Sequence, residues 1–149
     1  MSSKYIGSGK EITALNTYIK LTRATESINS LINKLLKNES LTESQFRVLD
    51  ALYHLGPLSQ KLLGEKLLKS GGNVTMVIDN LEKRKFVRRA RGSGDRRIFT
   101  VHLTKKGKEQ IKGIMPSVVK IISENINVLS KAEQNEFQSM LKKIGLKQK

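Results

Sequence analysis

The sequence contains no cysteine and no tryptophan, only two prolines, and 13 acidic residues against 28 lysines and arginines. Without cysteine the chain can form no disulfide, no thiolate metal site and no thiol redox switch. The two histidines, His54 and His102, lie far apart in the sequence, so they do not make a zinc motif either. We therefore predict that the protein holds no metal and no cofactor.

Long apolar runs are missing as well. No stretch approaches the roughly 18 apolar residues that are needed to span a bilayer, and Met1 is followed by polar residues rather than by the apolar region of a signal peptide. We therefore expect a cytoplasmic protein with no membrane partner. A chain of 149 residues has room for one domain with a core, or for one small domain and an oligomerisation segment.

Patterns typical of enzymes are also absent from the sequence. It shows no Ser/His/Asp set, no paired-carboxylate motif, no phosphate-binding loop and no metal-ligand spacing. We therefore predict no catalytic residues and no enzymatic activity.

What the sequence does have is positive charge, and this charge is concentrated. The net charge is +15, and residues 83–108 carry eleven positive side chains and one negative one, which is +10 of that total. Such an excess favours a polyanionic partner, with nucleic acid first and an anionic membrane surface second.

The first half of the chain has helical periodicity. No glycine or proline occurs between Lys10 and Leu55, and apolar residues recur largely at steps of three and four. This pattern predicts a helix over 10–37. Thr42 and Gln45 then form a capping box that opens a second helix, which should end at Gly56 because the next residue is a proline.

Two shorter helices should follow. Ser59 can cap the first of them. The second is predicted over roughly 71 to 84 with Ser70 as its N-cap, and its inward face is apolar. That face consists of Val74, Val77, Ile78 and Leu81.

The pattern then changes to that of β-structure. Residues 86–91 and 98–103 are rich in β-branched and aromatic side chains, and Gly92 to Asp95 supply a turn, so we predict a β-hairpin with a basic tip. Thr104 should cap a long helix that Pro116 kinks. Ser130 and Glu133 form a capping box that opens the last helix.

These elements predict a mainly helical protein with a small β-wing. Residues 42–104 make a winged helix-turn-helix, a unit that places one helix in the major groove of double-stranded DNA. The flanking helices, 10–37 and 105–146, carry Ile and Leu stripes that so small a unit cannot cover. We therefore expect the single protomer, 1–149, to form a homodimer through them.

The sequence resembles the MarR family of bacterial transcriptional regulators. The motifs that carry the resemblance occur in family order and spacing over about residues 10–146. They are LTESQFRVL at 41–49, GPLSQKLL at 56–63, NVT at 73–75, DNLEK at 79–83, DRR at 95–97 and VHLTKKG at 101–107. The resemblance implies a homodimer on a pseudo-palindromic operator, usually repressing, and often released by a small aromatic effector.

Two departures from the family pattern matter. The family usually has a glycine after the recognition helix, where this chain has Lys85; if the backbone still needs a positive φ there, Lys85 bears strain of about 1 kcal/mol. The N-terminal cysteine of the redox-sensing branch is also missing. Residues 68–75 and 115–116 look closest to a cysteine-free branch that responds to quinones and phenols.

The predicted recognition helix offers a set of outward side chains. Asn73 is the best base reader, because its amide can bind adenine through two hydrogen bonds; the alternative is that it only supports the helix cap. The helix N-terminus can also bind a phosphate. The residues assigned to DNA binding here are Ser70, Gly72, Asn73, Thr75, Met76 and Asn80.

The wing supplies the second set. The resemblance implies that Arg97 enters the minor groove and that Asp95 orients it; the alternative is an ordinary surface ion pair. Arg89, Arg91 and Arg96 are interpreted as phosphate contacts, or else as a solvated run of charge.

Tyr53 and His54 are the candidate lining of an effector site, since family members place a cleft near this position. For His54 the favoured interpretation is a satisfied packing histidine rather than an effector contact. A different function also stays open, that of a nonspecific architectural DNA-binding protein, and the ratio of specific to nonspecific affinity at a stated salt concentration separates the two.

Overall fold

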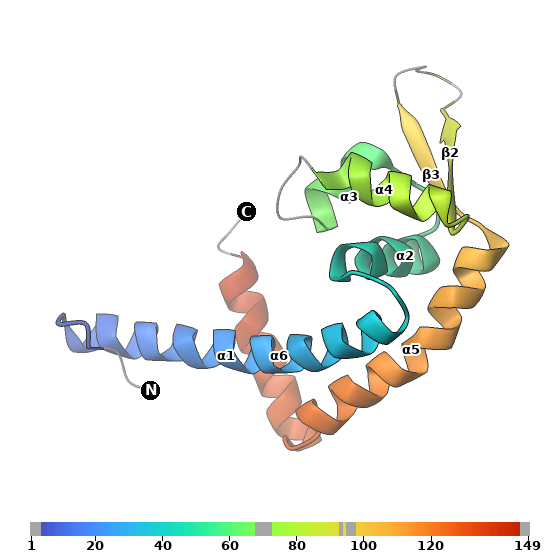
Figure 1. Cartoon of the computed structure of the whole chain (residues 1–149). Coiled ribbons are helices and arrows are strands. Elements are labelled where there is room, and N and C mark those ends of the chain that lie inside the picture. The colour runs from blue at the N-terminus through green and yellow to red at the C-terminus, as the bar shows by residue number, and fades with distance from the viewer. Residues whose placement is uncertain (1–3, 68–72, 93, 95–97, 147–149) are drawn as a thin grey trace. The chain divides into compact units, whose positions relative to one another are not determined.

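The computed structural model describes residues 4–67, 73–92, 94 and 98–146, and it is mainly helical with a small sheet (Figure 1). The elements in chain order are α1 (Gly9–Asn38), α2 (Glu43–Leu55), β1 (Leu58–Ser59), α3 (Gln60–Leu67), α4 (Val74–Lys83), β2 (Val87–Arg91), β3 (Phe99–Leu103), α5 (Lys105–Ile126) and α6 (Lys131–Leu146). They divide into two compact units. We call residues 33–117 the winged unit, and residues 1–32 with 118–149 the helical unit.

Side-chain caps open several helices as the sequence predicts. In the capping box of α2 the Thr42 N–H donates to Gln45 Oε1, and the Gln45 N–H donates to Thr42 Oγ1, both at 3.1 Å. Ser130 and Glu133 exchange the same two bonds before α6. Ser8 and Glu11 do so before α1, a cap that was not predicted from the sequence.

Helices α1 and α4 end in the same way. The residues Ser40 and Lys85 have φ values of 53° and 62°. The N–H groups that follow α4 donate back into it, from Lys85 to Glu82 O and from Phe86 to Leu81 O, which is a Schellman motif. The backbone therefore does need a positive φ at Lys85, and Lys85 occupies a conformation that favours glycine.

The sheet has three antiparallel strands in the order β1-β3-β2. The hairpin of β2 and β3 is confirmed, with Arg89 opposite Val101. Strand β1 was not predicted, because its two residues are too few to show a period. It pairs with β3, and its Ser59 Oγ also accepts the Leu62 N–H and so caps α3.

The core of the winged unit lies between its helices and the sheet. It contains fully buried side chains from α2, α3, α4 and β3, among them Leu49, Leu63, Ile78 and Val101. Helix α4 begins at Val74 with Asn73 at the N-cap position, whereas the sequence predicted a start near 71 with Ser70 as the cap. Ser70 and the two glycines at 71 and 72 lie outside the described residues.

A tight joint connects the hairpin to α5. Thr104 caps α5 as predicted, because its Oγ1 accepts the Gly107 N–H at 3.0 Å, and its own N–H donates to Phe86 O at 3.0 Å. A Cβ atom on Gly107 would lie 2.1 Å from Phe86 O. Only glycine therefore fits at position 107, in the first turn of α5, with this geometry.

The helical unit contains parts of α1 and α5 together with α6. Between α1 and α6 it has an apolar cavity of about 380 Å³, whose lining includes Leu21, Phe137 and Leu141. Helix α5 continues through Pro116. Among the described residues, no helix combines the length and the apolar character that membrane crossing requires.

Candidate nucleic-acid interface

Helix α4 has two distinct faces, as its sequence pattern predicts. Its apolar side packs into the winged unit, with Val77, Ile78 and Leu81 buried. The other side is exposed to solvent and mostly polar. The exposed set is Asn73, Thr75, Met76, Asp79, Asn80 and Lys83.

Asn73 and Thr75 stand at the start of this exposed face. Asn73 occupies the N-cap position of α4, but its side chain makes no capping hydrogen bond. The structure therefore does not support the alternative in which the Asn73 side chain only caps the helix. Thr75 Oγ1 accepts a hydrogen bond from Gln60 Nε2 at 3.1 Å, so α3 anchors the Thr75 side chain.

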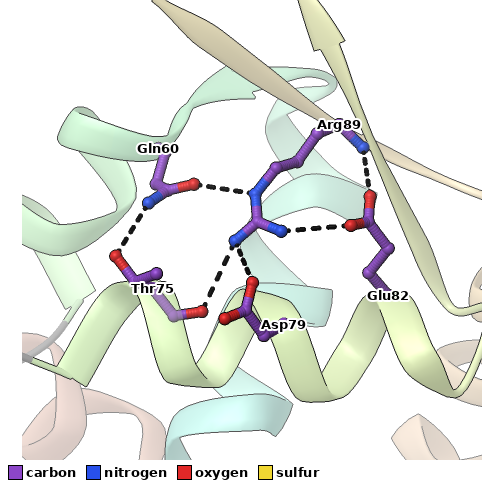
Figure 2. A network of polar contacts seen from close by, with 5 residues as sticks. All are labelled: Gln60, Thr75, Asp79, Glu82 and Arg89. Carbon is purple, nitrogen blue, oxygen red and sulfur yellow. Dashed lines mark hydrogen bonds and ion pairs between the residues drawn. The ribbon is translucent and has the colours of Figure 1, made fainter.

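Arg89 of β2 lies in a network of polar contacts rather than in solvent (Figure 2). Its guanidinium reaches Asp79 Oδ1 at 2.6 Å and Glu82 Oε1 at 3.1 Å, both on α4. It also donates to Gln60 Oε1 at 3.0 Å and to the carbonyl oxygen of Thr75 at 3.4 Å. The Arg89 side chain is only 17% exposed, so the residue predicted to contact a phosphate is held by protein groups in this structure.

The outer end of the hairpin carries the other wing residues. The Gly92 N–H donates to Ile98 O at 3.1 Å, and the Arg91 guanidinium lies 5.9 Å from the centre of the Phe99 ring on the facing strand. Arg91 is exposed and available to a phosphate. The predicted DNA contacts that lie outside the described residues are Ser70, Gly72, Asp95, Arg96 and Arg97.

Two cations in the basic segment stabilise the winged unit itself. Arg84 and Lys106 lie over the Phe86 ring, 4.7 Å and 5.2 Å from its centre. Lys106 Nζ donates to Arg84 O at 3.1 Å, and the Arg84 guanidinium donates to Ser40 O. In the sequence both residues register only as positive charge for a polyanion, because a charge count does not show which side chains the fold uses.

Tyr53 and His54 lie at the end of α2. Their rings are 5.1 Å apart in an edge-to-face arrangement, and His54 Nε2 lies 3.2 Å from Asp50 Oδ1. The His54 side chain is 56% exposed, and its contacts with Tyr53 and Asp50 agree with a packing role at the surface end of α2. Within the part of the chain that the structure describes, no three His, Cys, Asp or Glu side chains cluster as metal ligands would.

Comparisons with known proteins agree with this architecture. The MarR family model matches residues 41–99. The transcriptional regulator MhqR of Bacillus subtilis is 36% identical over 136 residues, which cover 91% of this chain and 94% of MhqR.

Solved structures show the same fold. BpsR of Bordetella bronchiseptica, whose DNA binding is regulated by 6-hydroxynicotinic acid, is 25% identical with a TM-score of 0.77, over 87% of this chain and 98% of BpsR. Sco3205 of Streptomyces coelicolor, a MarR family regulator in complex with DNA, has a TM-score of 0.80 at 17% identity, over 97% of this chain and 91% of Sco3205.

Proposed function

This chain belongs to the MarR family of winged helix-turn-helix, DNA-binding transcriptional regulators, and from that premise we propose that it is a sequence-specific repressor. It acts as a homodimer on a pseudo-palindromic operator and is released by a small aromatic effector. The observation that carries the proposal is the exposed face of α4, where Asn73 is not used as a side-chain cap.

Base readout and backbone contacts come from different elements in this proposal. The face of α4 enters the major groove, where Asn73 reads a base while Thr75 and Met76 contact a thymine methyl group or a phosphate. Asn80 lies on the same face and belongs to the DNA-binding set. Ser70 and Gly72 supply contacts at the start of the helix. In the wing, Arg97 enters the minor groove, Asp95 orients it, and Arg91 and Arg96 bind phosphates.

Exposed apolar side chains of the helical unit support the homodimer. They include Tyr18, Val119, Ile122, Phe137, Met140, Leu141 and Ile144. One copy leaves these groups in water, together with the apolar cavity between α1 and α6. A second copy of the chain covers them at a symmetric interface.

Two observations support release by a small aromatic effector. The chain has no cysteine, so peroxide has no thiol through which to act, and 6-hydroxynicotinic acid regulates the DNA binding of BpsR. An effector acts by binding more tightly to a dimer whose recognition helices are spaced wrongly for two half-sites roughly 34 Å apart. Tyr53 and His54 are the proposed lining residues.

The decisive experiment selects DNA with the full-length chain from random-sequence duplexes. Fluorescence anisotropy then compares the selected duplex with a scrambled duplex of the same composition at one stated salt concentration. We expect the selected duplex to bind at least about a thousandfold more tightly. A ratio near one would support the architectural alternative instead.

The effector is tested on the same complex with a panel of phenols, quinones and 6-hydroxynicotinic acid. We expect some of these compounds to release the selected duplex at concentrations that leave the dimer intact by light scattering. Failure of the whole panel would contradict the effector proposal, and release by peroxide that a thiol reductant reverses would contradict the argument from absent cysteine.

A further inference from the structure

We infer that Arg89 is a positioning residue, which holds the wing against the recognition helix so that both elements meet one DNA site together. The inference rests on the proposed function, because it concerns sequence-specific binding. It assigns Arg89 a role different from the phosphate contact expected from the sequence, and one that a binding experiment separates from it.

The backbone of Arg89 is the first point of attachment. Strand β2 lies at an edge of the described sheet. The Gly92 N–H to Ile98 O bond marks a hydrogen-bonded pair, and such pairs alternate along an antiparallel ladder, so the N–H of Arg89 points to the open edge. There it donates to Glu82 Oε2 at 2.8 Å. The carboxylate of Glu82 thus connects α4 to the edge of the wing.

The guanidinium of Arg89 is the second point of attachment. On α4 it contacts the Thr75 carbonyl, Asp79 and Glu82, which are spaced by four and three residues and so lie on one side of the helix. It also donates to Gln60, at the start of α3. One side chain therefore joins β2, α3 and α4, and the planar fork of arginine suits several acceptors at once (Figure 2).

Withdrawing Arg89 to bind a phosphate would work against DNA binding. It would leave two carboxylates, Asp79 and Glu82, without their partner on the helix that faces DNA. These carboxylates would then repel the phosphates of the same duplex. In the observed arrangement, Arg89 instead neutralises part of this negative charge while it stays inside the protein.

Holding two reading elements in a fixed relation matters most for a specific site. When the wing and the recognition helix form one rigid body, contact by one places the other at its own groove, which raises its effective concentration there. Nonspecific binding depends on phosphate charge and needs no such match. Loosening the network should therefore reduce specific affinity more than nonspecific affinity.

The test compares Arg89→Gln with Arg88→Gln in the full-length chain. Arg88 is the adjacent, exposed residue of β2, so both variants lose the same charge in nearly the same place. We expect the specific-to-nonspecific ratio to fall at least about tenfold more for Arg89→Gln than for Arg88→Gln. The salt slope of Arg89→Gln should match that of Arg88→Gln, whereas a lost phosphate contact would lower it by about one.

Two further variants keep the test decisive if Arg89→Gln folds poorly. Glu82→Gln keeps the side-chain shape and removes a negative charge, so charge alone predicts tighter binding, whereas positioning predicts weaker binding to the selected duplex. Arg89→Lys keeps the positive charge but lacks the planar guanidinium. Its specific-to-nonspecific ratio should therefore stay below that of the wild-type chain.

Each outcome then has a clear meaning. Tighter binding by Glu82→Gln, full rescue by Arg89→Lys, or a salt slope lowered by about one in Arg89→Gln alone would each overturn the positioning role. If the wild-type chain selects no duplex, the proposed function fails and the inference fails with it. A selected duplex whose recognition is equally affected by the Arg88 and Arg89 variants would overturn the inference alone.

Discussion

At the scale of single residues, three positions fix how the hairpin joins the helices around it. Lys85 follows α4 with a positive φ, and Gly107 lets the first turn of α5 lie against the Phe86 carbonyl. The Thr104 hydroxyl donates to the Lys85 carbonyl oxygen and accepts the Gly107 N–H, so it connects the two positions. Each of these positions has a physical requirement that a substitution can test.

We expect Gly107→Ala to destabilise the protein by about 3 kcal/mol, because its Cβ would overlap a backbone oxygen that cannot move away cheaply. Gly113→Ala is the matched control on the same helix, since a Cβ there meets nothing within 4 Å and alanine is the better helix former. Thermal unfolding at one protein concentration makes the comparison. A Gly107→Ala variant as stable as Gly113→Ala would contradict the crowding argument.

Lys85 allows the cost of its backbone conformation to be measured. Lys85→Gly should unfold with a free energy about 1 kcal/mol higher than Lys85→Ala, because both variants lose the charge but only glycine adopts φ near 62° without strain. Denaturant unfolding of the two variants gives the difference directly. Equal stabilities would mean that the positive φ at this position costs nothing.

At the scale of elements, α4 and the wing are the two elements proposed to contact DNA. They come from segments with different periods, and polar contacts join them across the winged unit. Their separate contributions can be distinguished by changes at the wing tip, at positions outside the described residues.

Asp95→Ala and Arg97→Ala should both weaken binding to the selected duplex. The Asp95 variant does so although it removes a negative charge, because the proposed role of Asp95 is to hold Arg97 in the minor groove. Lys105→Ala, at the exposed start of α5, is the control: it should weaken binding to all sequences alike and lower the salt slope by about one. Tighter binding by Asp95→Ala would show that charge alone governs the wing.

At the scale of the whole molecule, each unit has its own task in the proposal. The winged unit reads DNA, and the helical unit joins two copies. The second task depends on the apolar surface that α1 and α6 leave uncovered in one chain.

Leu141→Lys should therefore convert the dimer into single chains, because it places a charge in the apolar surface. Ser139→Lys, on the same helix but not in the cavity lining, adds the same charge and should leave the dimer intact. Light scattering gives the mass of each variant in solution. A Leu141→Lys protein that still has the mass of two chains would place the dimer interface elsewhere.

Local features of this protein follow directly from the spacing of residues in the chain. Thr42 with Gln45 and Ser130 with Glu133 are pairs only three residues apart, so their caps follow from spacing. The apolar stripe of α4 likewise determined which of its sides is exposed. The motif order was enough to identify the family, because each motif is local.

The roles of the basic side chains depend instead on how distant parts of the chain pack together. Arg89 forms hydrogen bonds with Gln60, which is 29 residues away in the sequence, and with Thr75, which is 14 residues away. Arg84 forms one with Ser40, which is 44 residues away. No periodicity encodes such pairs, since they depend on how separate elements pack. Strand β1 and the space at Gly107 were decided in the same way, by partners that are distant in the sequence. Charge content therefore predicted a polyanionic partner, whereas packing decided which cations remain to meet it.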